Sequence, residues 1–148
     1  IVRRICRELG AAPGGRPIRV SVAADLPLVL ADESRVGQML VNLLENALKY
    51  APHGPIAVSA APGPEEVVVR VVDEGPGIET ADREHVFERF YRGRQVRESA
   101  RPGSGLGLYL CRRLAEAQGG RIWLDSTEQG TSIAFSLPLA GRPVALPG

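Results

Sequence analysis

Two asparagines and a lysine are spaced so that they would share one face of a helix. Asn42, Asn46 and Lys49 stand at i, i+4 and i+7. An Asn carbonyl is a hard oxygen that suits Mg²⁺, and a Lys ammonium is a point charge that suits phosphate. Lys49 is also the only lysine among 18 basic residues. A solvated polar face would have the same spacing, so the pattern alone leaves both interpretations open.

A carboxylate and two glycines follow an apolar run at residues 67–72. Asp73 closes the run, and Gly75 and Gly77 come directly after it. A carboxylate at the end of a strand can accept a hydrogen bond from an exocyclic amine such as that of adenine. Glycines beside it let a planar ring approach the backbone closely. The alternative is a Gly-Pro-Gly turn in which Asp serves only the local backbone.

A second glycine cluster at residues 103–108 (GSGLGL) opens a predicted helix. Free amides at a helix N-terminus can bind an anion. The cluster is not a Walker loop, because no Lys-Ser/Thr follows, and its spacing is a poor dinucleotide fingerprint. Four arginines precede it, at positions 92, 94, 97 and 101. A flexible hinge beside a solvated basic loop is the alternative interpretation.

The elements that must position these residues follow from hydrophobic periodicity. Helices are predicted over residues 1–9, from an Asp32 or Ser34 cap to near Tyr50, over residues 80–90, and from 106 to a Gly119-Gly120 stop. Extended segments are predicted at residues 18–22, 28–30, 56–60, 67–72, 121–125 and 132–137. The long helix carries a core stripe of Val36, Leu40, Leu43 and Ala47.

These elements predict an α+β fold. Strands outnumber helices and short turns join several of them, so we expect a two-layer α/β sandwich with a mixed, mostly antiparallel sheet and helices packed on one face. The nearly continuous apolar run at residues 67–72 further predicts a strand buried on both faces.

Together, these segments resemble the sequence boxes of sensor histidine kinases. The N box is matched by residues 42–50 (NLLENALKY), the first glycine box by 73–78 (DEGPGI), the F box by 87–92 (FERFYR), the second glycine box by 103–108, and the closing box by 129–131 (QGT). Their order and spacing agree, over roughly residues 18–139. The chain thus resembles the catalytic and ATP-binding domain of a two-component sensor histidine kinase. That domain has the Bergerat-type fold of the gyrase, heat-shock chaperone, histidine kinase and MutL ATPase superfamily.

The resemblance implies ATP and Mg²⁺ as cofactors. Asn46 would hold Mg²⁺, with Asn42 assisting through the phosphates or a water, and Lys49 would contact the phosphates. Tyr50 would pack on adenine, and Asp73 would bind its amine. The remaining residues expected around the nucleotide are Gly75, Gly77, Ile78, Gly103, Ser104, Gly105, Leu106, Gly107, Leu108 and Thr131.

The resemblance also implies how phosphate would be transferred. Arg92 and Arg101 would reach toward the γ-phosphate, and would join Asn42 and Lys49 as catalytic residues, with residues 93–104 as an ATP lid. Hydrolysing relatives carry a Glu general base where this chain has Asn42, and an amide cannot take a proton at neutral pH. Phosphotransfer is therefore favoured over hydrolysis. A degenerate ATP-binding scaffold and a gyrase- or MutL-type ATPase are the alternatives.

The resemblance implies partners outside this sequence. His53 and His85 both lack a phosphoacceptor context, and both are expected at the surface. The accepting histidine would lie on a dimerisation domain of the parent protein, without which this domain is inactive as a kinase. That domain would pass the phosphoryl group to a response regulator.

Composition sets the remaining bounds. The chain has 148 residues, of which 44% are apolar and 24% are charged, and its net charge is +1. This composition excludes a disordered chain or a membrane bundle and gives no case for nucleic-acid binding.

Cys6 and Cys111 lack metal spacing, so a reducing, cytoplasmic compartment is expected, although the parent could be membrane-anchored. Because the sequence starts at Ile1, we expect a fragment. Residues 1–139 would form the domain, with 1–10 ending a linker helix and 140–148 forming a tail.

Overall fold

The computed structural model describes residues 1–12, 16–51, 53–78, 80–88, 107–125 and 130–140. Its elements, in chain order, are α1 (Val2–Ala11), β1 (Ile18–Val22), α2 (Glu33–Tyr50), β2 (Ile56–Pro62), β3 (Glu66–Asp73), α3 (Thr80–Arg83), α5 (Gly107–Ala117), β4 (Ile122–Leu124) and β5 (Thr131–Pro138).

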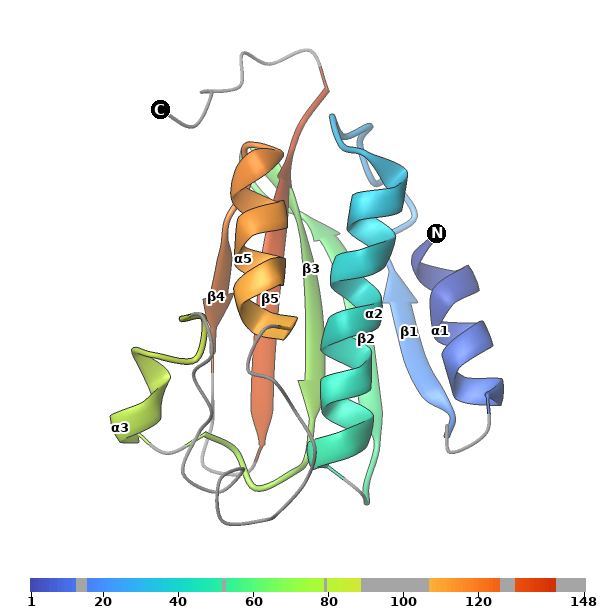
Figure 1. The fold of residues 1–148 in the computed structure, drawn as a ribbon. Helices are drawn as coiled ribbons and strands as arrows, with labels where there is room; N and C mark the ends of the chain where they lie inside the picture. Colours follow the sequence, from blue (N-terminus) through green and yellow to red (C-terminus); the bar gives the residue numbers. More distant parts are fainter. Residues whose placement is uncertain (13–15, 52, 79, 89–106, 126–129, 141–148) are drawn as a thin grey trace.

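The strands form one five-stranded sheet in the order β1-β2-β3-β5-β4. The β1–β2 pair is parallel, and the other pairs are antiparallel. Helices α1, α2 and α5 lie side by side over one face of this sheet (Figure 1). The predicted two-layer α+β fold with a mixed, mostly antiparallel sheet is confirmed.

The register brings the ends of four strands to one edge of the fold. Ile18 pairs with Ile56, Ile56 with Asp73, and Asp73 with Thr131. The carboxylate that the sequence singles out therefore lies in a row with the start of β1, β2 and β5. Helix α2 also ends at this edge, because the connection from Tyr50 to Ile56 is short.

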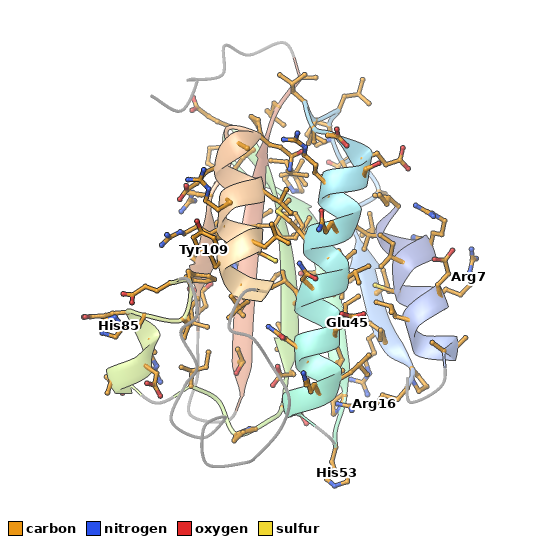
Figure 2. All side chains as sticks on the ribbon, in the orientation of Figure 1. Arg7, Arg16, Glu45, His53, His85 and Tyr109 are labelled. Carbon is orange, nitrogen blue, oxygen red and sulfur yellow. The ribbon has the colours of Figure 1, made fainter. Side chains whose placement is uncertain are left out.

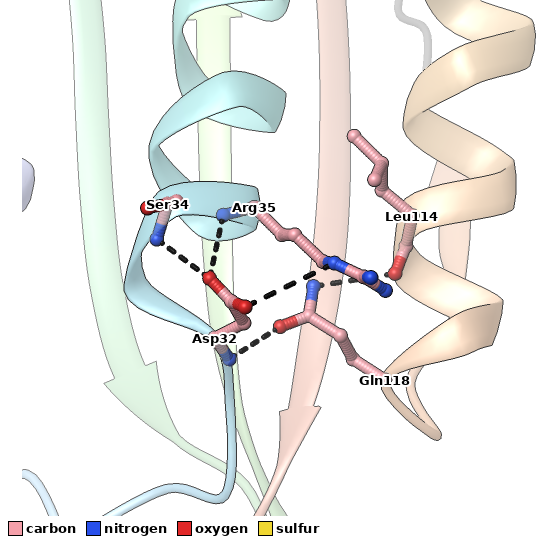
Figure 3. Close-up of polar contacts among 5 residues, drawn as sticks. All are labelled: Asp32, Ser34, Arg35, Leu114 and Gln118. Atoms are coloured by element: carbon pink, nitrogen blue, oxygen red, sulfur yellow. Dashed lines mark hydrogen bonds and ion pairs between the residues drawn. The ribbon is translucent and has the colours of Figure 1, made fainter.

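Helix α2 begins where the sequence predicts. The Asp32 side chain accepts hydrogen bonds from the backbone N–H groups of Ser34 and Arg35, as an N-cap does (Figure 3). The Asp32 N–H in turn donates to the side-chain oxygen of Gln118, at the end of α5, over 2.8 Å. The amide of Gln118 donates to the Leu114 carbonyl of α5 over 3.2 Å, which fixes the Gln118 side chain, and so the start of α2 is tied to the end of α5.

The predicted core stripe of α2 is buried. Val36, Leu40, Leu43 and Ala47 are at most 5% exposed, and Met39 and Leu44 join them. They pack against Ile5 and Cys6 of α1, Cys111 and Ala115 of α5, and the inner face of the sheet. More than one stripe of α2 is buried because α1 and α5 cover both its flanks.

Several predicted boundaries are wrong. Helix α1 runs past Gly10 to Ala11, and residues 28–30 form only an isolated bridge, between Val29 and Leu139. The helix predicted over residues 80–90 ends at Arg83, and turns follow through residue 87. The reason is local: the N–H of His85 bonds the carbonyl of Asp82, three residues back, which closes a tight turn rather than an α-helical one.

Strand β3 is not buried on both faces. Val67, Val69 and Val71 are buried under the helices, whereas Val68, Arg70 and Val72 are only half-buried. The helices cover one face of the sheet, so an apolar run on the central strand still has one face partly open (Figure 1). The C-terminal tail from residue 141 lies outside the described residues.

Candidate nucleotide-binding site

The polar stripe of α2 is not a solvated face. Asn42, Asn46 and Lys49 are all half-buried, whereas Glu45, one position before Asn46, is exposed (Figure 2). Burying amide groups costs free energy unless they are hydrogen-bonded, so a half-buried pair of Asn side chains on one helix favours a binding role.

Within the part of the chain that the structure describes, the amide nitrogen of Asn42 lacks an oxygen or nitrogen acceptor. Its Nδ2 is buried and has no hydrogen-bond partner among the described residues. The amide lies beside the Cys111 thiol of α5, whose pKa burial raises to about 12 while Asn42 acts in the opposite direction. Sulfur is a weak acceptor. The Cys111 thiol itself donates to the Met39 carbonyl, with 3.7 Å between Sγ and the oxygen. Among the described residues, the Asn42 donor therefore faces only the weakly accepting sulfur of Cys111.

Asp73 is held at the end of β3 by backbone amides. Its Oδ1 accepts the Gly75 N–H at 2.9 Å, and the Thr131 N–H also bonds the carboxylate. Burial raises the pKa of Asp73, and the two amides, followed by the positive charge of Arg16, lower it in part. A carboxylate in this environment retains acceptor capacity for a ligand amine, since each oxygen can accept more than one bond.

The glycines around Asp73 are required by close backbone approach. A Cβ on Gly75 would lie 2.7 Å from the Ala51 Cβ and 3.0 Å from Asp73 Oδ1. A Cβ on Gly130 would lie 2.1 Å from the Asp73 carbonyl oxygen. Gly77 has a φ of 75°, in the left-handed region that favours glycine. The first and closing glycine boxes thus meet around one residue, Asp73, although they are far apart in sequence.

The first residues of α5 border a space that the other described residues leave open. Gly107 and Leu108 are half-buried, and a Cβ on Gly107 would meet nothing within 4 Å, so the described residues leave open space there. Thr131 and Ile78 are half-buried near Asp73. Arg92, Arg101 and residues 103–106 lie outside the described residues, as do the predicted lid and the Tyr50 side chain.

The structure adds two residues that the sequence analysis did not single out for this site. Arg16 donates from Nε to the Gly54 carbonyl at 3.0 Å and from a terminal nitrogen to the Ala51 carbonyl. Cys111 lies against Asn42. Neither has a signal in the sequence, because Arg16 sits in a Pro/Gly-rich connection and Cys111 on an ordinary helix stripe.

Neither histidine is placed as a phosphoacceptor. His53 is exposed in the connection after α2, and His85 is half-exposed and bonds Glu88 at 2.6 Å (Figure 2). The carboxylate of Glu88 raises the pKa of His85. Both surface predictions are confirmed. Both cysteines are free, as expected, and within the described residues no helix is long and apolar enough to span a membrane.

The fold and these residues define an ATP-binding domain of the histidine kinase type. The family model described as histidine kinase-, DNA gyrase B- and HSP90-like ATPase matches residues 31–141. The chain belongs to this family.

Its relatives are sensor kinases. It is 43% identical over 125 residues to the adaptive-response sensory kinase SasA of Synechocystis sp., across 82% of this chain and 32% of the relative. Full-length ShkA, solved in complex with AMPPNP, is 31% identical with a TM-score of 0.76 over 97% of this chain and 30% of ShkA. The mycobacterial sensor histidine kinase MprB is also 31% identical, with a TM-score of 0.73 over 93% of this chain and 90% of that chain. The chain spans about a third of the length of the curated relatives it matches.

Proposed function

We propose that this domain binds Mg²⁺·ATP and transfers the γ-phosphoryl group to a histidine on a separate dimerisation domain of its parent protein. An imidazole nitrogen would attack the γ-phosphorus, the bond to the bridging oxygen would break, and ADP would leave. The dimerisation domain would then pass the phosphoryl group from its histidine to a response regulator. The two free cysteines favour a cytoplasmic location.

The observation that carries the proposal is the meeting of α2 and β3 at one edge of the sheet. Ala51, directly after α2, lies against Gly75, whose amide binds Asp73. A purine amine bound to Asp73 would therefore lie beside the end of the helix that carries Lys49 and Asn46. This arrangement supports adenine at Asp73, with Gly75, Gly77, Ile78 and Thr131 around it.

The phosphates would extend from there along α2 toward the start of α5. Asn46 would provide an amide oxygen to Mg²⁺, which keeps several waters and needs few protein ligands. Asn42 Nδ2, buried without a conventional acceptor among the described residues, would donate to a phosphate oxygen or a metal-bound water. Lys49 and the amides near Gly107 would neutralise phosphate charge.

Phosphotransfer fits these residues better than hydrolysis. Phosphoryl transfer needs positioning and charge neutralisation rather than covalent chemistry by the protein. Hydrolysis, however, needs a base that takes a proton from the attacking water, and Asn42 cannot act as one. An acceptor histidine is itself a nucleophile at neutral pH, so it does not need that base. Arg92 and Arg101 are proposed to stabilise the γ-phosphate during transfer.

Calorimetric titration with AMPPNP, with and without Mg²⁺, tests the site. Binding should be micromolar to sub-millimolar and stronger with Mg²⁺. Asn46→Ala should abolish the Mg²⁺-dependent part, whereas Glu45→Ala, at the adjacent exposed position, should leave it intact. Unchanged affinity in Asn46→Ala would refute the metal role.

Phosphotransfer is tested by mixing the domain with [γ-³²P]ATP and the parent's dimerisation domain. Label should appear on the histidine domain, and ATP hydrolysis by this domain alone should stay near background. Binding without transfer would favour a degenerate scaffold. Steady hydrolysis by the isolated domain would favour a gyrase- or MutL-type ATPase.

A further inference from the structure

A single arginine joins the start of the sheet to the end of the N-box helix. The Arg16 guanidinium donates to the carbonyls of Ala51 and Gly54, the former directly after α2 and the latter in the connection to β2. Figure 2 shows Arg16 at this end of α2. Carbonyls at a helix C-terminus lack intrahelical partners, and a cation there is also favoured by the helix dipole.

The two carbonyls belong to the backbone that contacts the adenine side of the proposed site. Ala51 is 1% exposed and would touch a Cβ on Gly75. Gly54 has a φ of 89° and packs against Glu74, where a Cβ would lie 3.4 Å from that side chain. The two residues that follow Asp73 thus rest on the segment that Arg16 holds.

We propose that Arg16 is a positioning residue for the nucleotide site: by holding the carbonyls of Ala51 and Gly54, it fixes Ala51 against Gly75 and so the direction of the Asp73 carboxylate. The inference rests on the proposed function. Arg16 is close enough to Asp73 for its charge to lower the pKa of that carboxyl, which supports the same placement. No contact between Arg16 and nucleotide is required.

Arg16 also connects this edge to α1. A Cβ on Gly10, in the last turn of α1, would lie 3.1 Å from the Arg16 carbonyl oxygen. The backbone of Arg16 therefore rests on α1 while its side chain holds the end of α2. A Gly10→Ala substitution would displace Arg16 by a few tenths of an ångström without altering its side chain, which makes it a second, independent perturbation.

The test compares Arg16→Ala with Arg19→Ala, a nearby exposed arginine on β1. We expect Arg16→Ala to raise the Kd for AMPPNP about tenfold, since bonds from a charged donor are among the stronger ones. The Kd for the guanine analogue GMPPNP should change less than twofold. Guanine has a carbonyl at C6, where adenine has the amine that Asp73 would bind. Arg16→Lys keeps the positive charge but loses the planar guanidinium that bonds two carbonyls at once. It should bind AMPPNP more tightly than Arg16→Ala and less tightly than the unchanged protein. Gly10→Ala should shift selectivity in the same direction, by less.

Equal losses for both analogues, or a loss equal to that of Arg19→Ala, would overturn the positioning role. Asp73→Asn separates this failure from failure of the site. If Asp73→Asn relaxes the preference for AMPPNP and Arg16→Ala does not, only the Arg16 inference is wrong. If neither changes it, the adenine assignment fails as well. Should Arg16→Ala fail to fold, Arg16→Lys and Gly10→Ala decide the question by the same comparison, which is the change in Kd for AMPPNP against the change in Kd for GMPPNP.

Discussion

Gly75 offers a sharp test of the geometry around Asp73, because its contacts are so close. In Gly75→Ala, the new Cβ would lie 2.7 Å from the Ala51 Cβ, 3.1 Å from the Ala51 Cα and 3.0 Å from Asp73 Oδ1. The first contact is shorter than real Cβ contacts, and its partner is a buried methyl that cannot rotate away. Either residue 51 or the backbone after Asp73 must move.

The loss of stability in Gly75→Ala can be estimated from the known cost of overpacking. Forced insertion of a methyl into a packed site costs about 1–3 kcal/mol. For a domain of this size, 1 kcal/mol shifts Tm by about 2–4 °C, so Gly75→Ala should lower Tm by about 2–12 °C. Because Asp73 Oδ1 is one of the displaced atoms, the Kd for AMPPNP should rise at least about tenfold, a change worth about 1.4 kcal/mol.

Thermal unfolding and calorimetry measure the two effects, and Gly37→Ala is the matched control. Gly37 lies in the interior of α2, and its new Cβ would meet only the tips of Ile1 and Ile5, at 3.4 Å or more. Replacing a helical glycine by alanine typically stabilises by about 0.5–1 kcal/mol. The same chemical change should therefore raise Tm at residue 37 and lower it at residue 75.

A second-site change identifies the clashing atom. Ala51→Gly removes the methyl nearest to the new Cβ, so the double variant Ala51→Gly/Gly75→Ala should be more stable than the sum of the single changes predicts. We expect a coupling of at least about 0.5 kcal/mol, as for residues in contact. Additive effects, or a Gly75→Ala variant with unchanged Tm and Kd, would refute the close approach at this position.

Two further predictions concern contacts away from the nucleotide. Gln118→Ala removes the bond that ties the end of α5 to the start of α2, and with it the bond from the Gln118 amide to the Leu114 carbonyl within α5 (Figure 3). It should lower the free energy of unfolding by about 1 kcal/mol in urea titrations, whereas Gln38→Ala, at an exposed position of α2, should be near neutral. Cys6 and Cys111 are buried, and burial raises the pKa of both thiols, that of Cys111 to about 12. At pH 8 neither should react with Ellman's reagent until the domain is unfolded, and rapid reaction of the native protein would contradict the packing of α1 and α5.

Local patterns determined most of the fold. Amphipathic spacing placed α2 and its core stripe, and Asp32 was expected as a candidate cap because its side chain can bond nearby backbone amides. Alternation and turn residues placed the strands, and their order indicated a mixed sheet. The predictions failed where a local pattern is ambiguous: the segment after Arg83 closes as turns, and the valine run of β3 is buried on one face only.

The sequence by itself also identified the residues that could bind a nucleotide, since the types and spacing of Asn42, Asn46, Lys49 and Asp73 are local properties of the chain. Tertiary structure decided what surrounds them. Strand register brings Thr131 to Asp73, and packing brings Cys111 to Asn42. Arg16 reaches the end of α2 across 35 residues. Such contacts depend on how helices and strands pack, a property of the whole chain that local spacing does not encode.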